Sequence, residues 1–263
     1  MIPENGIARF ERIAEVYDAT REPIDPETLG GLVDHLRREE CRSLLEIGVG
    51  TGRVALPLAE AGFEVTGIDP ARNMLRRARS KGMVRLVRGS GQSLPFVSDS
   101  FDAALLVHVL HVLPDPVVVL RRAGRVSRKS VLSLLSERSD FSLPSEAAGT
   151  FDPRQLFRQV VREAGVARPN RQNPSVGEQS AVRRFPPDFD HLLSDRWVRE
   201  PLDRHLTRLA HRAALPGAPE STTVALQRAI ESVRRSLGNP LLRYRRRHRL
   251  VGWDSERLKL SEN

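Results

Sequence analysis

The stretch that most constrains the fold is a run of apolar residues followed at once by three closely spaced glycines. Residues 44–47 have the length and composition of a parallel strand that is covered on both faces, and Gly48, Gly50 and Gly52 follow it. Glycine adopts positive φ without strain and lets a ligand approach the backbone N–H groups. Residues 54–59 then have the pattern of a helix that packs back on the sheet. This stretch predicts a ligand site where a strand feeds a helix.

A carboxylate follows the next predicted strand. Residues 63–68 read as that strand and end in Asp69, which is placed beside the glycine turn to accept two ribose hydroxyls. The strand, glycine turn, helix, second strand and terminal acid together indicate a nucleoside-binding βαβ unit. The spacing alone does not say which nucleoside binds.

Three segments, taken in order, resemble the motifs of the class I S-adenosylmethionine (SAM) methyltransferases. Residues 46–52 resemble their first motif, residues 68–75 the second, and residues 94–111 the fourth. The resemblance covers roughly residues 10–135, and the branch it resembles most contains the ubiquinone and menaquinone C-methyltransferases (type 11 domain). The NAD-binding fingerprint G-x-G-x-x-G has a wider glycine spacing. The tighter spacing here, with Glu46 before the turn, favours SAM.

The resemblance implies cofactor contacts at particular positions. Tyr17 and Asp18 match a Tyr-Asp pair whose Tyr reaches the methionine end of SAM, and Pro70 and Met74 match residues that lie against the adenine. Packing in the core is the competing interpretation of Tyr17 and Met74. Ser90 stands where the family usually has an Asp that bonds the adenine amino group. The predicted cofactor-binding residues are Tyr17, Glu46, Gly48, Gly50, Gly52, Asp69, Pro70, Met74, Ser90, Gly91 and Val107.

His108 follows the strand predicted at residues 101–107, at the sheet edge where open α/β folds hold their ligands. A histidine of ordinary pKa could take a proton from a nucleophile. The alternative is that His108 only ends the strand. We interpret it as a residue that lines the site near the reacting methyl rather than as a base. The scattered histidines and the single cysteine, Cys41, give no metal-ligand spacing, so we expect no metal site.

The implied fold is α/β: a Rossmann-like, seven-stranded, mostly parallel sheet with helices on both faces and a helical cap inserted before the last strand. We expect four parts: N-terminal helices over the cofactor site (1–40), the SAM-binding core (41–184), a helical cap or substrate lid (185–238), and the last strand with the C-terminal tail (239–263). Helices are predicted at 6–20, 26–39, 71–80, 114–126, 151–164, 188–196, 199–214 and 220–237. Later strands are predicted at 83–87, 101–107 and 128–135, within 166–184, and at 245–253, with a loop at 137–150.

The net charge of +9 resides in the second half of the 263-residue chain, because residues 1–150 hold equal numbers of acidic and basic residues. The lone Cys41 excludes an internal disulfide, which fits a reducing compartment. The N-terminus has no apolar signal core, and no apolar run is long enough to span a bilayer. We therefore expect a cytoplasmic protein, a monomer or homodimer.

These observations lead to a SAM-dependent methyltransferase that moves a methyl group to a small-molecule acceptor by in-line displacement, with S-adenosylhomocysteine as product. One alternative is an RNA (tRNA) methyltransferase that uses the basic C-terminal half, where Trp197, Tyr244 and Trp253 lie among arginines. A second alternative is a non-catalytic SAM-binding protein. Arg245, Arg247 and Arg249 alternate along one predicted strand face, which we interpret as solvated.

Overall fold

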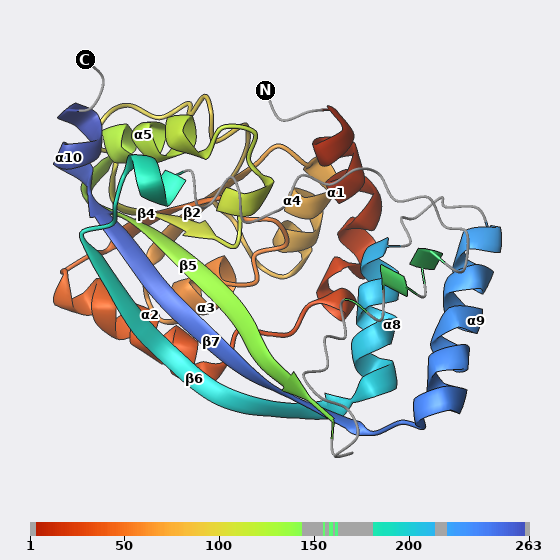
Figure 1. Ribbon diagram of the computed structural model, residues 1–263. Coiled ribbons are helices and arrows are strands. Elements are labelled where there is room, and N and C mark those ends of the chain that lie inside the picture. Colours follow the sequence, from red (N-terminus) through yellow and green to blue (C-terminus); the bar gives the residue numbers. More distant parts are fainter. Residues whose placement is uncertain are drawn as a thin grey trace.

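The computed structural model describes residues 4–143, 155, 158, 159, 161, 162, 181–213 and 220–260. Figure 1 shows one twisted sheet with helices on both faces, and a long ribbon of strands that continues beyond them. Its strands are β1 (Ser43–Ile47), β2 (Glu64–Asp69), β3 (Leu86–Arg88), β4 (Phe101–Val107), β5 (Ser127–Ser142), β6 (Phe189–Pro201) and β7 (Leu241–Asp254).

The strand order confirms the predicted fold class. The sheet has seven strands in the order β3-β2-β1-β4-β5-β7-β6. The strands from β1 to β5 pair in parallel, whereas β7 is antiparallel to β5 and β6 is antiparallel to β7. The fold is therefore an α/β, Rossmann-like, mostly parallel sheet. Its order reverses between β1 and β4, and ligands bind such sheets at the carboxyl ends of the strands at this point.

Helices cover the two faces of the core. They are α1 (Glu4–Tyr17), α2 (Pro26–Arg38), α3 (Ala55–Glu60), α4 (Arg72–Ser80), α5 (Pro116–Val126), α8 (Leu202–Ala213), α9 (Glu220–Leu237) and α10 (Ser255–Leu260). Successive strand residues point to opposite faces. Leu44 and Leu105 pack with α2 and α3, whereas Leu45 and Leu106 pack with α5 and α10. Burial on both faces explains the continuous apolar runs of β1 and β4.

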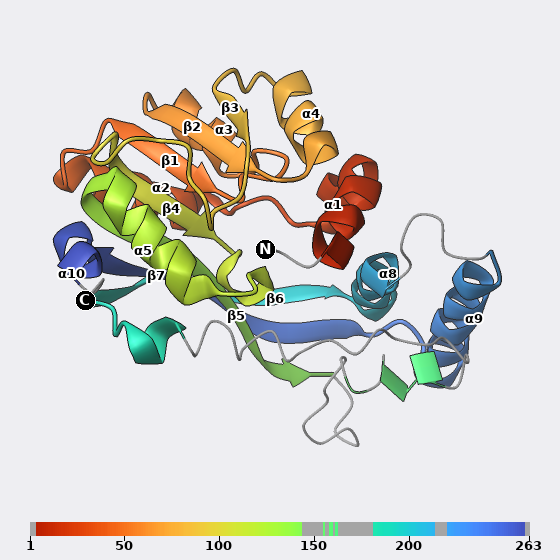
Figure 2. The same cartoon turned by 90° about the horizontal axis from the view of Figure 1, so that it is seen from above.

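The strands β5, β7 and β6 extend past the core as an antiparallel ribbon, and α8 and α9 lie at its far end (Figures 1 and 2). A separate hydrophobic cluster fills this end and includes Leu206 of α8, Leu226 of α9, and Leu242 and Tyr244 of β7. In both views α8 lies close to α1, and it contacts the turn of residues 18–20 that follows α1. The helices predicted at 199–214 and 220–237 are therefore confirmed as α8 and α9, and α8 contacts the N-terminal segment.

The helix predicted at 188–196 is wrong, because this segment lies within strand β6. The polar residues of this segment mask the alternation of apolar and polar residues that indicates a strand. The alternation can be recognised only once the neighbouring strand β7 is known. Asp190 pairs with Arg249 and Asp195 with Arg245, both across the β6–β7 ladder. The sixth strand predicted within 166–184 is also misplaced: residues 181–184 are helical, and residues 166–180 lie outside the described part.

Three further predictions need correction or fall outside the structure. The third strand is Leu86–Arg88 rather than 83–87, and Met83 is buried in the core instead. The loop predicted at 137–150 is a strand as far as Ser142, because β5 pairs with β7 from Ser130 to Ser139 and again at Ser142. The remainder of that loop, like most of the helix predicted at 151–164, lies outside the described residues.

Asp102 holds the sheet edge opposite the glycine turn. Its Oδ2 accepts hydrogen bonds from the backbone N–H groups of Arg42, at 2.8 Å, and Ser43, at 2.9 Å. Its Oδ1 accepts one from Arg128 Nη2 at 2.8 Å. Burial alone would raise the pKa of this carboxyl, but these donors prevail and hold its pKa well below the usual range.

We expect Asp102→Ala to lower the free energy of unfolding by about 1–3 kcal/mol at pH 7, because two backbone N–H groups and Arg128 lose a charged acceptor. The deficit should shrink toward strongly acid pH, where the wild-type carboxylate is protonated as well. Urea denaturation at several pH values measures both effects. Glu64→Ala is the control, because Glu64 forms an exposed pair with Arg85 and such pairs contribute about 1 kcal/mol or less. Equal losses in the two variants would contradict this account.

Candidate functional site

The glycine turn between β1 and α3 has the backbone geometry that its sequence predicts. Gly48, Gly50 and Gly52 have φ values of +75°, +54° and +76°. A side chain at Gly48 would collide with Val109, since an added Cβ would lie 2.7 Å from its Cγ2. Above Gly50 the space is open, with only the carbonyl oxygen of Gly48 at 4.0 Å from such a Cβ. The turn therefore leaves room for a ligand over its middle glycine.

Asp69 at the end of β2 reaches this turn. Its Oδ2 accepts a hydrogen bond from the N–H of Gly50 at 2.9 Å, and its Oδ1 accepts one from the N–H of Ala71 at 2.8 Å. The side chain is buried, with the residue 8% exposed. Burial raises the pKa of Asp69 to about 6, although both backbone hydrogen bonds act to lower it. The acid thus lies beside the glycine turn, as the sequence predicts.

Glu46 of β1 is buried directly before the turn. Its Oε2 has no hydrogen-bond partner among the described residues. Burial raises the pKa of Glu46 to about 8, and the N–H of Ala55 and the charge of Arg53 only partly oppose this. A buried carboxyl with an unpartnered oxygen beside the glycine turn can bind a cationic or hydrogen-donating ligand group.

The N-terminal helix lies against α4, and Asp18, which follows the helix, contacts the glycine turn. Glu11 accepts hydrogen bonds from the N–H groups of Arg72, at 2.6 Å, and Asn73, at 2.7 Å, and so caps α4 from a different helix. Asp18 accepts a hydrogen bond from the Thr51 hydroxyl at 2.5 Å. These contacts fix the segment of residues 10–18 over the βαβ unit.

Tyr17 and Met74 both take part in the packing between α1 and α4. Met74 is fully buried in a cluster with Ile13 and Ala14, and Tyr17 packs at its margin, edge-on to Phe10 with 6.3 Å between ring centroids. The packing interpretation of both residues therefore has support, and their contacts with a cofactor stay predictions.

The other predicted cofactor residues surround the same strand ends. Ser90 Oγ accepts a hydrogen bond from the N–H of Gln92 at 3.2 Å, so its hydroxyl already has a local partner. Gly91 lies against the end of β1, where an added Cβ would be 2.8 Å from Ile47 Cγ2. Pro70 directly follows Asp69, and Val107 ends β4. The structure thus gathers the predicted residues at one edge of the sheet.

His108 directly follows β4 in a left-handed conformation, with φ of +52°, and its N–H donates to the carbonyl oxygen of Leu134 at 3.2 Å. Burial, then the neighbouring His248, lowers the pKa of His108 to about 3. The imidazole is therefore neutral near pH 7, and its weak basicity agrees with a lining role. The rings of His108 and His248 lie 6.2 Å apart.

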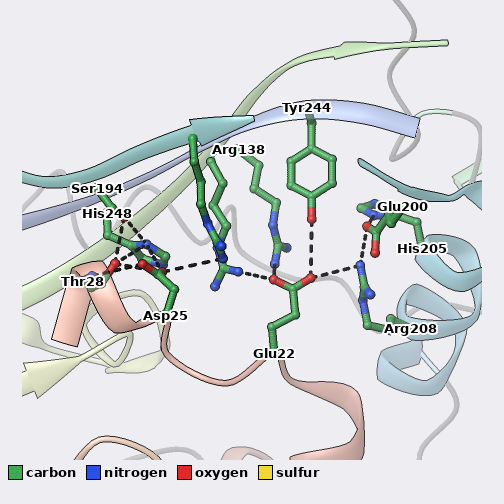
Figure 3. A network of polar contacts seen from close by, with 12 residues as sticks. Glu22, Asp25, Thr28, Arg138, Ser194, Glu200, His205, Arg208, Tyr244 and His248 are labelled. Atoms are coloured by element: carbon green, nitrogen blue, oxygen red, sulfur yellow. Dashed lines mark hydrogen bonds and ion pairs between the residues drawn. The ribbon is translucent and has the colours of Figure 1, made fainter. Parts of the chain in front are cut away.

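Sequence analysis missed the polar network around His248, shown in Figure 3. Thr28 Oγ1 donates to Asp25 Oδ2 at 2.8 Å and lies 2.9 Å from His248 Nδ1, while Ser194 Oγ lies 3.0 Å from the same nitrogen. Burial and Arg246 lower the pKa of His248 to about 4. Burial would raise the pKa of Asp25, but the two hydrogen bonds from Thr28 prevail and lower it. The network joins α2, β6 and β7.

A second set of contacts converges on Glu22, between η1 (residues 18–20) and α2 (Figure 3). Its carboxylate pairs with Arg246, with Arg208 at 3.2 Å and with Arg138 at 3.5 Å. The Tyr244 hydroxyl donates to it at 3.4 Å. Burial would raise the pKa of Glu22, but the three guanidinium groups lower it. These contacts with Glu22 cannot be predicted from spacing in the sequence, because the residues come from four separate segments of the chain.

The predicted exposed face of β7 is confirmed, and it is largely neutralised. Arg245 and Arg247 pair with Asp195 at 2.5 and 3.3 Å. Arg249 pairs with Asp190 and with Glu137. These pairs offset much of the positive charge that the RNA alternative requires.

A groove of about 910 Å³ lies elsewhere, between α2 and β6, and shares no lining residue with the predicted site. His35, Phe189 and His191 stack beside it, with ring centroids 4.7–6.0 Å apart. Among the described residues, no group of three or more His, Cys, Asp or Glu could hold a metal ion. No helix in the described part of the chain is long and apolar enough to cross a membrane.

We compared the chain with models of known protein families. Residues 45–135, which contain the glycine turn, Asp69 and His108, match the family model of the methyltransferase domain. Residues 45–135 form a methyltransferase domain. The resemblance seen in the sequence is thereby confirmed.

The chain is similar to several demethylmenaquinone methyltransferases. That of Renibacterium salmoninarum is 27% identical over 75% of this chain and 83% of its own length. That of Geobacillus kaustophilus is 32% identical, over 56% of this chain and 66% of its own length. Among solved structures, a proposed type II methyltransferase from Anaeromyxobacter dehalogenans shares the fold, with a TM-score of 0.52 and 19% identity over 89% of this chain and 98% of its own.

We expect Glu46→Gln to change how stability depends on pH. The wild type should lose stability as pH rises from about 4.5 to about 8, because the unfolded chain releases this proton before the folded chain does. The variant has no such proton. Its stability relative to the wild type should rise across that window by a few kcal/mol, at about 1.4 kcal/mol per pKa unit. Urea denaturation at pH 5 and pH 8 measures this.

Glu60→Gln is the matched control, because Glu60 is exposed on α3 and its loss should leave the pH dependence unchanged. Parallel pH profiles for the wild type and Glu46→Gln would show that the carboxyl of Glu46 ionises normally in the folded protein.

Proposed function

We propose that this chain is a SAM-dependent methyltransferase acting on a small-molecule acceptor. The observation that carries the proposal is the Asp69 carboxylate, hydrogen-bonded at 2.9 Å to Gly50 in a domain that matches methyltransferases. Fit to the cofactor is supported by the open space above Gly50 and by the unpartnered Oε2 of Glu46. When bound, SAM supplies a methyl group on a sulfonium, and this methyl passes to the acceptor by in-line displacement.

The residues of the chain would bind and orient the two reactants. Asp69 would accept the ribose hydroxyls, and the turn at Gly48–Gly52 would admit the cofactor to the backbone. Glu46, ionised on contact with an ammonium group, would hold the methionine end. Tyr17, Pro70, Met74, Ser90 and Gly91 would line the remainder, with Val107 and His108 toward the acceptor. Holding the nucleophile in line is the main requirement, and the low pKa of His108 supports a lining role.

The helices α8 and α9 would cover the acceptor. They pack on the far end of the β5–β7–β6 ribbon, and α8 lies close to α1 (Figure 2). We therefore propose residues 185–238 as the substrate lid, with strand β6 as its base, residues 41–184 as the core, residues 1–40 as the segment over the cofactor, and residues 239–263 as the completing strand and tail.

Asp69→Asn should weaken SAM binding by about 1–3 kcal/mol at pH 7, because a buried charged acceptor is lost. In the wild type, affinity should rise between pH 5 and pH 7 as Asp69, whose pKa is about 6, loses its proton. The variant should lack this rise. Calorimetric titration with SAM measures both, and Asp34→Asn, at an exposed position of α2, serves as control. Unchanged affinity in Asp69→Asn would remove the basis of the proposal.

Gly50→Val should abolish SAM binding while the chain still folds, because the new side chain would occupy the open space above the turn. Its left-handed φ also costs about 1–2 kcal/mol. Gly62→Val is the control, because Gly62 also has positive φ, at +97°, where Val costs at least as much, and has open space around it, away from the site. Both variants should unfold at lowered temperatures, but only Gly62→Val should bind SAM. Normal SAM binding by Gly50→Val would refute the proposed approach to the turn.

A further inference from the structure

Three arginines from three elements meet in the interior beside the predicted reaction site. We name Arg138 of β5, Arg208 of α8 and Arg246 of β7 the arginine cluster. All three pair with the single carboxylate of Glu22. Arg246 is 6% exposed, and the side chains of Arg208 and Arg138 are 13% and 17% exposed. Burying guanidinium groups is costly unless anions and hydrogen bonds compensate for the lost water.

The compensation is incomplete. Within the described ranges, the three guanidinium groups of the cluster pair with only two carboxylates, those of Glu22 and Glu200. The buried Nε atoms of Arg138 and Arg246 have no hydrogen-bond partner in the described part of the chain. The network thus keeps an excess of positive charge and unused N–H donors, both of which a further anion would satisfy.

The cluster adjoins the predicted site for methyl transfer. Arg53, which ends the glycine turn, donates to the backbone oxygen of Glu22. Arg246 also acts on His108, since its charge contributes to the lowered pKa of that residue. His108 and His248 in turn lie 6.2 Å apart, and His248 is two residues from Arg246 on the same face of β7. An acceptor that reaches His108 can therefore present a second group to the cluster.

We propose that the arginine cluster binds an anionic group, a carboxylate or a phosphate, on the methyl acceptor. This inference rests on the proposed function and narrows its substrate class. Guanidinium groups form paired hydrogen bonds with the oxygens of both groups. Because Arg208 belongs to α8, binding of the anion would also attach the lid to the core strands β5 and β7.

Glu22 shows that the cluster accepts a carboxylate, and it competes with the acceptor for the same arginines. Removal of its charge by Glu22→Gln should therefore strengthen binding of an external anion. The same strand supplies a matched control: Arg245 is the neighbour of Arg246 but lies on the opposite, exposed face, paired with Asp195.

The test is calorimetric titration of the full chain with inorganic phosphate at constant ionic strength, with chloride as the balancing anion. Arg246→Met and Arg138→Met should weaken phosphate binding about tenfold or more, as expected for the loss of a buried charged hydrogen bond. Glu22→Gln should strengthen it about tenfold, and Arg245→Met should leave it unchanged. Equal binding by Arg245→Met and Arg246→Met, or no gain in Glu22→Gln, would overturn the proposal.

Thermal unfolding of each variant establishes that it is folded. Arg246→Lys provides a second variant at the most buried position, because it keeps the charge but not the paired donors. It should bind phosphate with intermediate affinity. Wild-type affinity in Arg246→Lys would show that the planar guanidinium does not hold the anion.

Titration of the same variants with SAM separates the possible outcomes. Arg246→Met should keep SAM affinity within about twofold, whereas a loss of SAM affinity parallel to that of phosphate would assign the cluster to the cofactor's own carboxylate and refute an acceptor role. If the wild type binds phosphate through the cluster but does not bind SAM, the proposed function fails and the anion site remains. If SAM binds but phosphate does not, only the present inference fails.

Discussion

The hydrogen bonds of one carboxylate hold together the sheet edge where β1 and β2 end. Asp69 ends β2, accepts a hydrogen bond from Gly50 in the turn after β1 and another from Ala71 before α4. Two strand ends and a helix start are thereby fixed around one buried acid whose pKa is raised to about 6. Glu11 then caps α4 from α1, so that the N-terminal helix is positioned by the same unit. The βαβ unit therefore organises the segment that covers it.

A second constraint is the charge buried along the β5–β7–β6 ribbon. Glu22 joins the N-terminal segment to β5, β7 and α8 through Arg138, Arg246 and Arg208. Such buried ion pairs add little net stability, because desolvation offsets much of their attraction. Here they place a positively charged interior next to His108. Residues 45–135 of the core match a methyltransferase domain, and our proposal assigns the choice of acceptor to this charged interior.

The sequence predicted the parallel core well because each of its signals is local. The apolar runs of β1 and β4, the glycine turn and Asp69 lie within short stretches, and their geometry follows from backbone preferences. Strand β6 was wrongly predicted as a helix. Asp190 and Asp195 fit a strand only when they face the arginines of β7, and these lie more than 40 residues further along the chain. The pairing of Glu22 with Arg246 spans 224 residues. No periodicity reports a contact of that kind, so the interior charge network was unpredictable.

The most direct measurement is a calorimetric titration of the wild-type chain with SAM and with S-adenosylhomocysteine, with NAD as the comparison ligand. The account predicts micromolar binding of both SAM-type ligands and no comparable binding of NAD, because the turn Gly48–Gly52 has the tighter glycine spacing and the buried Glu46 that favour SAM. Binding of NAD in place of SAM, or of neither nucleoside, would contradict the assignment of this edge of the sheet as a methyl-transfer site.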